Sequence, residues 1–251
     1  MLRLSLLLLL AAMPLRAEEV VLGLSQNRIA ITANFDGSEI LIFGAVKREE
    51  AIPDEPLEVI IAISGPSLPL TVRRKDRRFG IWVNVDSFHV DEAPSFYAVA
   101  TSAGFNESIS LLQDAVHKVS VAKAIHSTKE GIDYGDRRNF LDAIIRIRED
   151  NGLYQTLENA VEVDEQTLFR TNITLPSNLT EGDYTARILL TRGGEVVSQY
   201  TTSIDVRKVG IERFLFKLSR EMPLIYGLMS LAIAIAAGWG ASAAFRIFQR
   251  D

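Results

Sequence analysis

The sequence predicts a mainly β protein: an immunoglobulin-like antiparallel sandwich with a helical insertion, followed by a single C-terminal transmembrane helix. Three observations favour this fold class. Short apolar or alternating runs, separated by turn residues, fill most of residues 18–206. The middle of that region instead shows helical periodicity. Residues 223–245 carry no charge, and as a helix of roughly 35 Å they are long enough to cross a bilayer.

The composition limits the classes of function. Of the 251 residues, 47% are hydrophobic and 24% are charged, as in an ordinary globular chain. Residues 18–206 hold 18 Lys and Arg against 29 Asp and Glu, and an acidic body of this kind predicts no nucleic-acid partner. The chain has no cysteine, which excludes disulfides, thiolate metal sites and a cysteine nucleophile.

Residues 1–17 have the pattern of a secretory signal peptide. Arg3 is followed by an apolar run over 4–13, the helix breaker Pro14 and the small residue Ala17, after which we expect cleavage. The run is too short to span a membrane.

Together with the later span, the signal pattern predicts that residues 18–222 lie outside and that 246–251 form a cytoplasmic tail. Five basic residues before the span against two after it oppose this orientation, but the first hydrophobic segment usually dominates.

The first half of the body is predicted to be strands. They are spaced about 10 residues apart, as in immunoglobulin-like sandwiches, although the cysteine pair of true immunoglobulins is absent. In this assignment the basic run 73–78 lies in a turn between two strands. The predicted strands are 20–24, 29–35, 39–46, 57–64, 70–74, 79–85 and 95–101.

The middle of the body is predicted to be helical. A short helix is expected over 106–117 and a longer one over 136–151, with Asp136 as its N-cap and Gly152 at its end. The longer helix is expected to cover an open face of the sheet, and the alternative is a helix that recognises a ligand. A subdivision of the body near 104–135 is left open.

Four more strands are predicted after the helices, at 160–163, 168–175, 183–192 and 195–206. Gly193 and Gly194 separate the last two. Because adjacent glycines supply the positive φ angles of a two-residue turn, they predict a tight hairpin.

Residues 207–222 return to helical periodicity. Apolar residues such as Leu215 and Leu218 share one side, so an amphipathic helix at the membrane surface is expected. Its cations Arg213, Lys217 and Arg220 are the predicted contacts to anionic lipid headgroups. The alternative is a straight stalk that continues into the span.

The spanning segment is rich in small residues. Small residues at four-residue steps let two helices approach closely, and this predicts packing against another membrane protein or a second copy of the chain. The alternative is an anchor without a partner. The predicted helix-packing residues are Gly227, Ser230, Ala234, Gly238 and Ser242.

Several segments together resemble one family. They are FGIWVN (79–84), SFYAVATSAG (95–104), LFRTNITLPSNLTEGDYTARILLTRGG (168–194) and the ending PLIYGLMSLAIAIAAGWGA. In sum, the chain resembles the putative transmembrane protein family of alphaproteobacteria. The resemblance implies a bacterial inner-membrane protein with a periplasmic body, and it brings no activity and no catalytic residue.

Few residues have metal-ligating or catalytic potential. The densest metal-like group is His89, Asp91 and Glu92, and the other histidines are His117 and His126. A site needs three or four converging ligands, so a polar strand end is favoured, and we expect no metal and no cofactor.

Two other patterns could have a chemical role. Ser120 and Lys123 match the serine–lysine spacing of penicillin-recognising enzymes, but the companion motifs are missing. The basic run 73–78 could bind phosphate, headgroups or an acidic partner, and a solvated loop is favoured.

No arrangement of residues in the sequence specifies a reaction or a ligand. The architecture favours a non-enzymatic, membrane-anchored periplasmic accessory protein that partners another inner-membrane or envelope component, such as a transporter. A receptor-like module for a small solute or envelope polymer is the alternative, and it requires a deep pocket lined by aromatic residues. An envelope enzyme is the third hypothesis, and it requires several of Ser120, Lys123, His89, Asp91 and Glu92 to converge.

Overall fold

The computed structural model describes residues 18–32, 35–48, 51–127, 134–209 and 211–248. The chain forms two compact units: residues up to 29 together with 36–206, which we call the body, and residues 30–35 together with 207–251, which we call the C-terminal unit. The predicted signal peptide, residues 1–17, lies outside the described residues.

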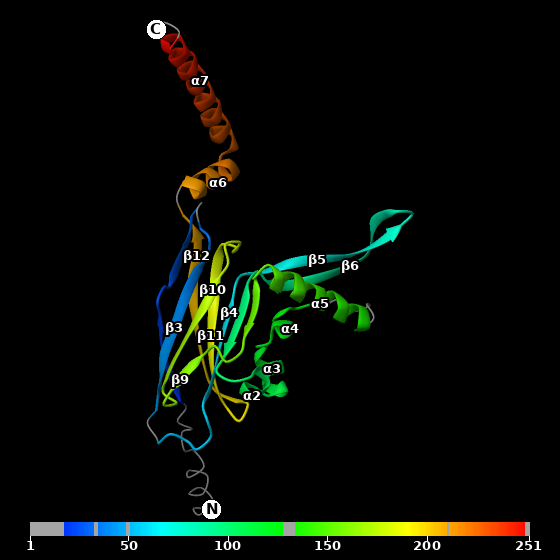
Figure 1. Ribbon diagram of the computed structural model, residues 1–251, viewed down its shortest axis with the longest axis vertical. Coiled ribbons are helices and arrows are strands. Elements are labelled where there is room, and N and C mark those ends of the chain that lie inside the picture. Colours follow the sequence, from blue (N-terminus) through cyan, green and yellow to red (C-terminus); the bar gives the residue numbers. More distant parts are fainter. Residues whose placement is uncertain (1–17, 33–34, 49–50, 128–133, 210, 249–251) are drawn as a thin grey trace, which may run out of the picture. The chain divides into compact units, whose positions relative to one another are not determined.

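Most strands of the body lie in two sheets (Figure 1). The mainly β prediction is confirmed, and the immunoglobulin-like connectivity stays a prediction. One sheet has the order β1 (Glu19–Leu24), β3 (Ser38–Lys47), β10 (Leu168–Leu175), β9 (Glu162–Asp164). The other has the order β2 (Arg28–Ile31), β12 (Glu195–Lys208), β11 (Gly182–Arg192), β4 (Glu58–Ser64), β7 (Tyr97–Thr101), β8 (Tyr154–Leu157).

Alternating side chains of the four-stranded sheet are buried on one face. Strand β10 alternates strictly between exposed and buried positions, and its buried side chains include Phe169 and Ile173. Opposite it in register, β3 buries Ile40 and Ile42. Because successive residues of a strand point to opposite faces, this pattern leaves the other face of the sheet to solvent.

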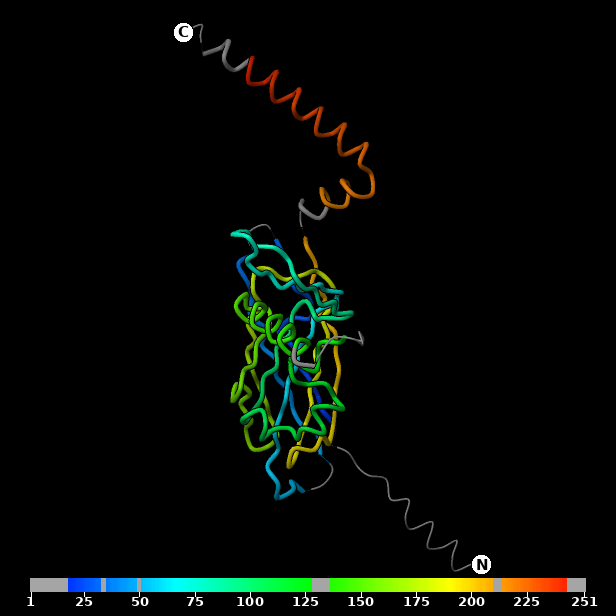
Figure 2. Tube along the Cα trace, turned by 90° about the vertical axis from the view of Figure 1, so that its right-hand side faces the viewer, coloured from blue at the N-terminus to red at the C-terminus, as the bar shows by residue number. Residues whose placement is uncertain are grey.

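The six-stranded sheet is buried on both faces at its centre. Strands β4 and β7 have runs of consecutive buried residues, as expected for strands that are covered on both sides. Helices and the base of a hairpin cover one of these faces, where Ile60, Val99 and Leu189 share a cluster with Phe140 and Ile144. Figure 2 shows the helices in front of the strands. They are α2 (Phe105–Ser108), α3 (Leu111–His117), α4 (Val121–Ala124) and α5 (Tyr134–Asp150).

The helical region differs in detail from the prediction. The expected helix over 106–117 is two helices, because Ile109 is extended and buried while the Ser110 hydroxyl accepts a hydrogen bond from the Gln113 amide and caps α3. Helix α5 begins at Tyr134, so Asp136 lies in its first turn and is not its cap. Strand β8 was not predicted, and it pairs in parallel with β7.

The hairpin of β5 (Ser67–Arg78) and β6 (Ile81–Pro94) is longer than predicted. Its turn is Phe79 and Gly80, so the prediction that the basic run 73–78 forms a turn is wrong. The run is strand, because each of its residues pairs across the hairpin. Figure 1 shows the hairpin extending away from the two sheets and past α5.

The C-terminal unit contains two helices. Helix α6 (Ile211–Glu221) is followed by α7 (Pro223–Phe248). Residues Pro223–Ser242 of α7 are long and apolar enough to cross a membrane, and a proline is well suited to the first helical turn. Residues 249–251 of the predicted cytoplasmic tail lie outside the described residues.

Candidate membrane-contact site

Helix α7 presents apolar side chains to its surroundings over its described length. Leu224 is 82% exposed and Trp239 is 73% exposed, and no residue of Pro223–Ser242 is buried within the protein. A surface of this kind is stable in lipid and not in water. The prediction of one C-terminal transmembrane helix is thereby supported.

The predicted packing residues are available on the helix surface. A Cβ atom added at Gly227 or Gly238 meets no neighbouring atom within 4 Å, so a second helix could approach there. The Ser230 hydroxyl donates to the Tyr226 carbonyl at 2.9 Å, which satisfies it within the helix. At about 100° per residue, Ala236 and Gly240 form a second line of small residues on roughly the opposite side of α7 from Ala234 and Gly238.

The cations of α6 have partners within the C-terminal unit. Lys217 lies 3.7 Å from Glu221, and the Arg220 guanidinium lies 5.4 Å from the centre of the Phe216 ring. Lys208 lies over the same ring at 5.8 Å. The side chain of the third predicted headgroup contact, Arg213, lies outside the described residues.

Phe216 was not among the predicted headgroup contacts, which were all cations. It is 54% exposed, and its spacing of four residues from Arg220 is the signal that could have identified it. An aromatic ring between two cations is well suited to the headgroup region of a membrane.

In the body, Arg74 connects the hairpin to α5. Its guanidinium donates to Asp86 at 2.6 Å and to Asp136 at 3.0 Å, and it lies 5.5 Å from the centre of the Phe140 ring. Its pKa is raised by the hydrogen bond to Asp86 first and by that to Asp136 second. Of the five cations of the basic run, Arg74 therefore has a structural role.

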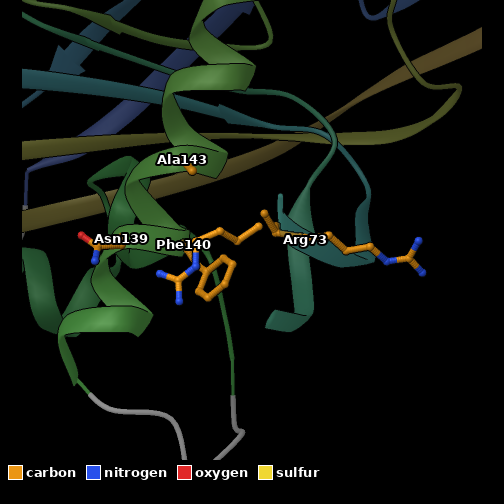
Figure 3. Close-up of a pocket in the computed structure, with 6 residues that line it drawn as sticks. Arg73, Asn139, Phe140 and Ala143 are labelled. Atoms are coloured by element: carbon orange, nitrogen blue, oxygen red, sulfur yellow. The ribbon is translucent and has the colours of Figure 1, made fainter. Parts of the chain in front are cut away.

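A small cavity lies between β5 and α5. Its volume is about 130 Å³, and its lining includes Val72, Asn139, Phe140 and Ala143. Figure 3 shows that Arg73 extends away from Phe140 and α5. Pockets for drug-sized ligands usually measure roughly 300–1,000 Å³, so this cavity suits at most a very small ligand.

The candidate metal-ligating residues have local partners. The Nδ1 atom of His89 lies 3.1 Å from the Thr71 hydroxyl, while its Nε2 atom lies 3.9 Å from Asp91. Glu92 and His126 pair through their backbones, and His117 contacts Gln199 at 3.2 Å. Among the described residues, no group of three or more His, Asp or Glu side chains could hold a metal ion.

Ser120 takes part in a turn between α3 and α4. Its hydroxyl donates to the Asp114 carboxylate at 2.8 Å. The same carboxylate accepts the backbone amides of Val119 and Ser120 at 3.1 and 2.7 Å. This buried aspartate fixes the turn, so the Ser120 hydroxyl has a structural partner besides any role with Lys123.

An ion-pair cluster near the start of the body was not predicted. The Glu18 carboxylate accepts from Arg48 at 2.6 Å and from Arg192 at 2.9 Å, and all three side chains are at most 15% exposed. Burial alone would raise the pKa of Glu18, but the hydrogen bonds and charges of Arg192 and Arg48 outweigh it, so the pKa is lowered. The three residues are far apart in the sequence, which gave no signal for the cluster.

A β body joined to one apolar C-terminal helix defines a single-span membrane protein. Residues 19–247 match the family model described as "Putative transmembrane protein (Alph_Pro_TM)", and the chain belongs to this family. The family resemblance found in the sequence is thereby confirmed. A comparison with curated proteins gave no match.

Proposed function

We propose that the protein is a non-enzymatic accessory subunit of the bacterial inner membrane. Its body lies in the periplasm, and α7 binds another membrane protein, such as a transporter, or a second copy of the chain. The observation that carries the proposal is the line of small residues along α7 at Ser230, Ala234 and Gly238. Small residues at this spacing are typical of helix pairs in membranes.

The signal pattern at residues 1–17 supports the proposed periplasmic orientation of the body. Cleavage after Ala17 would leave Glu18 as the first residue of the mature chain. Its carboxylate is already held by Arg48 and Arg192, so the new terminus would be fixed to the body. We infer that the remaining tail after α7 is cytoplasmic.

Helix α6 is proposed to rest on the membrane surface. Phe216 contacts the two cations Arg220 and Lys208 through its ring, and aromatic rings and cations are enriched together at the headgroup level. Lys217 is 66% exposed at its side chain and is therefore available to anionic lipid.

The accessory role is preferred over the other hypotheses because of the contacts of the candidate residues. Ser120 donates to Asp114, and His89 contacts Thr71. The cavity beside α5 is small for a solute site and contains one aromatic residue, Phe140, in its lining. These contacts favour neither a reaction centre nor a deep aromatic pocket.

Photo-crosslinking in the bacterial membrane tests the proposed contact. A photoreactive amino acid is placed at Ala234 or Gly238 and, as the comparison, at Ala236 or Gly240. We expect a defined adduct, with a partner or with a second copy, from the first pair and a much weaker one from the second. Equal labelling from both sides, or adducts with lipid alone, would contradict the proposal.

A matched pair of variants separates contact from anchoring. With the photoreactive amino acid at Ser230, on the same line of small residues, Ala234→Leu with Gly238→Leu should abolish the adduct while leaving the protein in the membrane, because the added side chains keep the helices apart. Ala236→Leu with Gly240→Leu adds the same bulk at the same spacing on the other side of α7 and should leave the adduct intact. The reverse result would assign the contact to the other side of α7.

A further inference from the structure

The apex of the β5–β6 hairpin is apolar and exposed. Phe79 is 106% exposed, Trp82 69% and Ile81 63%. No atom lies within 4 Å of the position of a Cβ on Gly80. Three large apolar side chains therefore gather at a hairpin tip, where no part of the described body covers them.

The backbone conformation of the turn is unfavourable for Phe79. Phe79 has φ 50° and Gly80 has φ 84°, which is the left-handed pair of a type I′ turn. Asn or Asp is the usual first residue of such a turn, and a bulky side chain there is an outlier. Because none of the described residues covers the Phe79 ring, its presence at a strained position points to a role for the ring outside the body.

Cations surround this apolar apex. Between Arg73 and Asp86 the hairpin carries five Lys and Arg against two Asp, whereas the body as a whole is acidic. Trp82 is opposite Arg77 in the register, and Lys75 is opposite Asn84, so these four share one face. Among the described residues, Arg73, Lys75 and Arg77 form no ion pair, in contrast to Arg74.

Tryptophan and other apolar residues beside Arg and Lys are typical of segments that enter the headgroup region of anionic membranes. Strand β12 ends at Lys208, and α6, which is about 16 Å long, lies between β12 and α7. The hairpin beyond Val72 adds roughly 20 Å of strand, which is comparable with the tether. A hairpin of this length can bring its apex to a bilayer surface.

We propose that the apex residues Phe79, Ile81 and Trp82 insert into the surface of the membrane that α7 spans, and that Arg73, Lys75 and Arg77 bind its anionic phosphate headgroups. This contact is independent of the partner contact proposed for α7. It gives the body a second attachment to the bilayer and so limits the orientations that the body adopts above it.

Trp82 can report on this contact directly, since the chain has only two tryptophans. In the full-length Trp239→Phe variant, Trp82 is the single tryptophan. The protein is reconstituted into phosphatidylcholine vesicles with or without phosphatidylglycerol, and Trp82 is quenched by brominated lipid or by acrylamide. With phosphatidylglycerol we expect a blue-shifted emission, quenching by brominated lipid and protection from acrylamide, all reversed by high salt.

Two hairpin variants and one control test the assignment of residues. Changing Arg73, Lys75 and Arg77 to Gln should reduce the ratio of inserted to free hairpin about a hundredfold. Phe79→Asn should also reduce insertion, although Asn-Gly is the better turn sequence. Changing the exposed cations Lys123, Arg138 and Arg146 to Gln removes the same charge elsewhere and should have little effect.

Two different results would overturn the proposal. Acrylamide access to Trp82 that is unchanged by phosphatidylglycerol would overturn the proposal. Protection from acrylamide that rises with protein concentration, without quenching by brominated lipid, would overturn it in favour of a second copy of the chain. Circular dichroism and thermal unfolding of each variant show whether the body is still folded, and Phe79→Asn is chosen because it should not weaken the fold.

Discussion

Glu18 illustrates how a single buried carboxylate stabilises the body. Arg48 and Arg192 bind it and lower its pKa below the ordinary value of 4.5. A carboxylate whose pKa is lower in the folded state stabilises the fold above its unfolded pKa, and this contribution is lost as the pH falls through the folded value. The stabilisation should therefore be complete at neutral pH and decline below about pH 4.5.

Glu18→Gln should lower the free energy of unfolding at neutral pH by about 3 kcal/mol, because two arginines are left without their counter-charge. The difference from the wild type should shrink in acid. Glu19→Gln is the control, since Glu19 is exposed and lies 3.6 Å from Lys47, and it should change stability by less than about 1 kcal/mol. Urea unfolding at several pH values measures both, and an equal loss from Glu18→Gln in acid and at neutral pH would contradict the account.

Phe79 has opposite effects on stability and on the proposed membrane contact. Phe79→Asn should raise the free energy of unfolding by about 1 kcal/mol, because asparagine tolerates the left-handed conformation. Chemical denaturation of the full chain in detergent checks this. A loss of stability would instead show that the ring packs against the protein.

For single residues, the sequence predicted turns better than the positions and partners of charged side chains. Gly193 and Gly194 were assigned to a tight hairpin, and both have positive φ. The turn at Phe79 was missed, because phenylalanine is rare at such a position and the neighbouring arginines were interpreted as a loop. No local sequence pattern indicates that Glu18 pairs with Arg48 and Arg192, because these residues are far from it in the sequence.

Helix α5 helps to cover one face of the six-stranded sheet. Phe140 is 6% exposed and stacks on Phe88 with ring centres 5.6 Å apart. Phe140→Ala should lower the free energy of unfolding by about 3–5 kcal/mol. Ile147→Ala on the same helix, where the side chain is 51% exposed, should cost within about 0.5 kcal/mol. Comparable losses for both in thermal unfolding would show that α5 does not form this core.

Elements with a local sequence pattern were predicted accurately, whereas elements that depend on pairing with distant residues were not. Strand β10 was predicted at its observed bounds, Leu168–Leu175, because its alternation of buried and exposed residues is local. Strand β8 was missed because it has four residues and pairs in parallel with a strand far away in the sequence. The length of β5 and β6 was underestimated since the pairing of charged residues with each other, as in Arg74 and Asp86, leaves no apolar alternation.

At the scale of the whole molecule, the sequence predicted the anchoring helix and the family but not the surfaces. The uncharged run from Pro223 onward is a signal of composition alone, and it needed no knowledge of packing. The exposed apex at Phe79 and the aromatic–cation contact at Phe216 depend on which side chains remain uncovered. Only the three-dimensional arrangement shows that.

We propose that α7 anchors a body that lies outside the cytoplasm, and cysteine labelling can test this orientation because the chain has no cysteine of its own. Single cysteines are placed at Ala51, in an exposed loop of the body, and after Asp251. Intact cells with a permeabilised outer membrane are treated with a maleimide that cannot cross the inner membrane. We predict that the cysteine at Ala51 is labelled at once and the C-terminal cysteine only after lysis, whereas labelling of the C-terminal cysteine alone in intact cells would contradict the account.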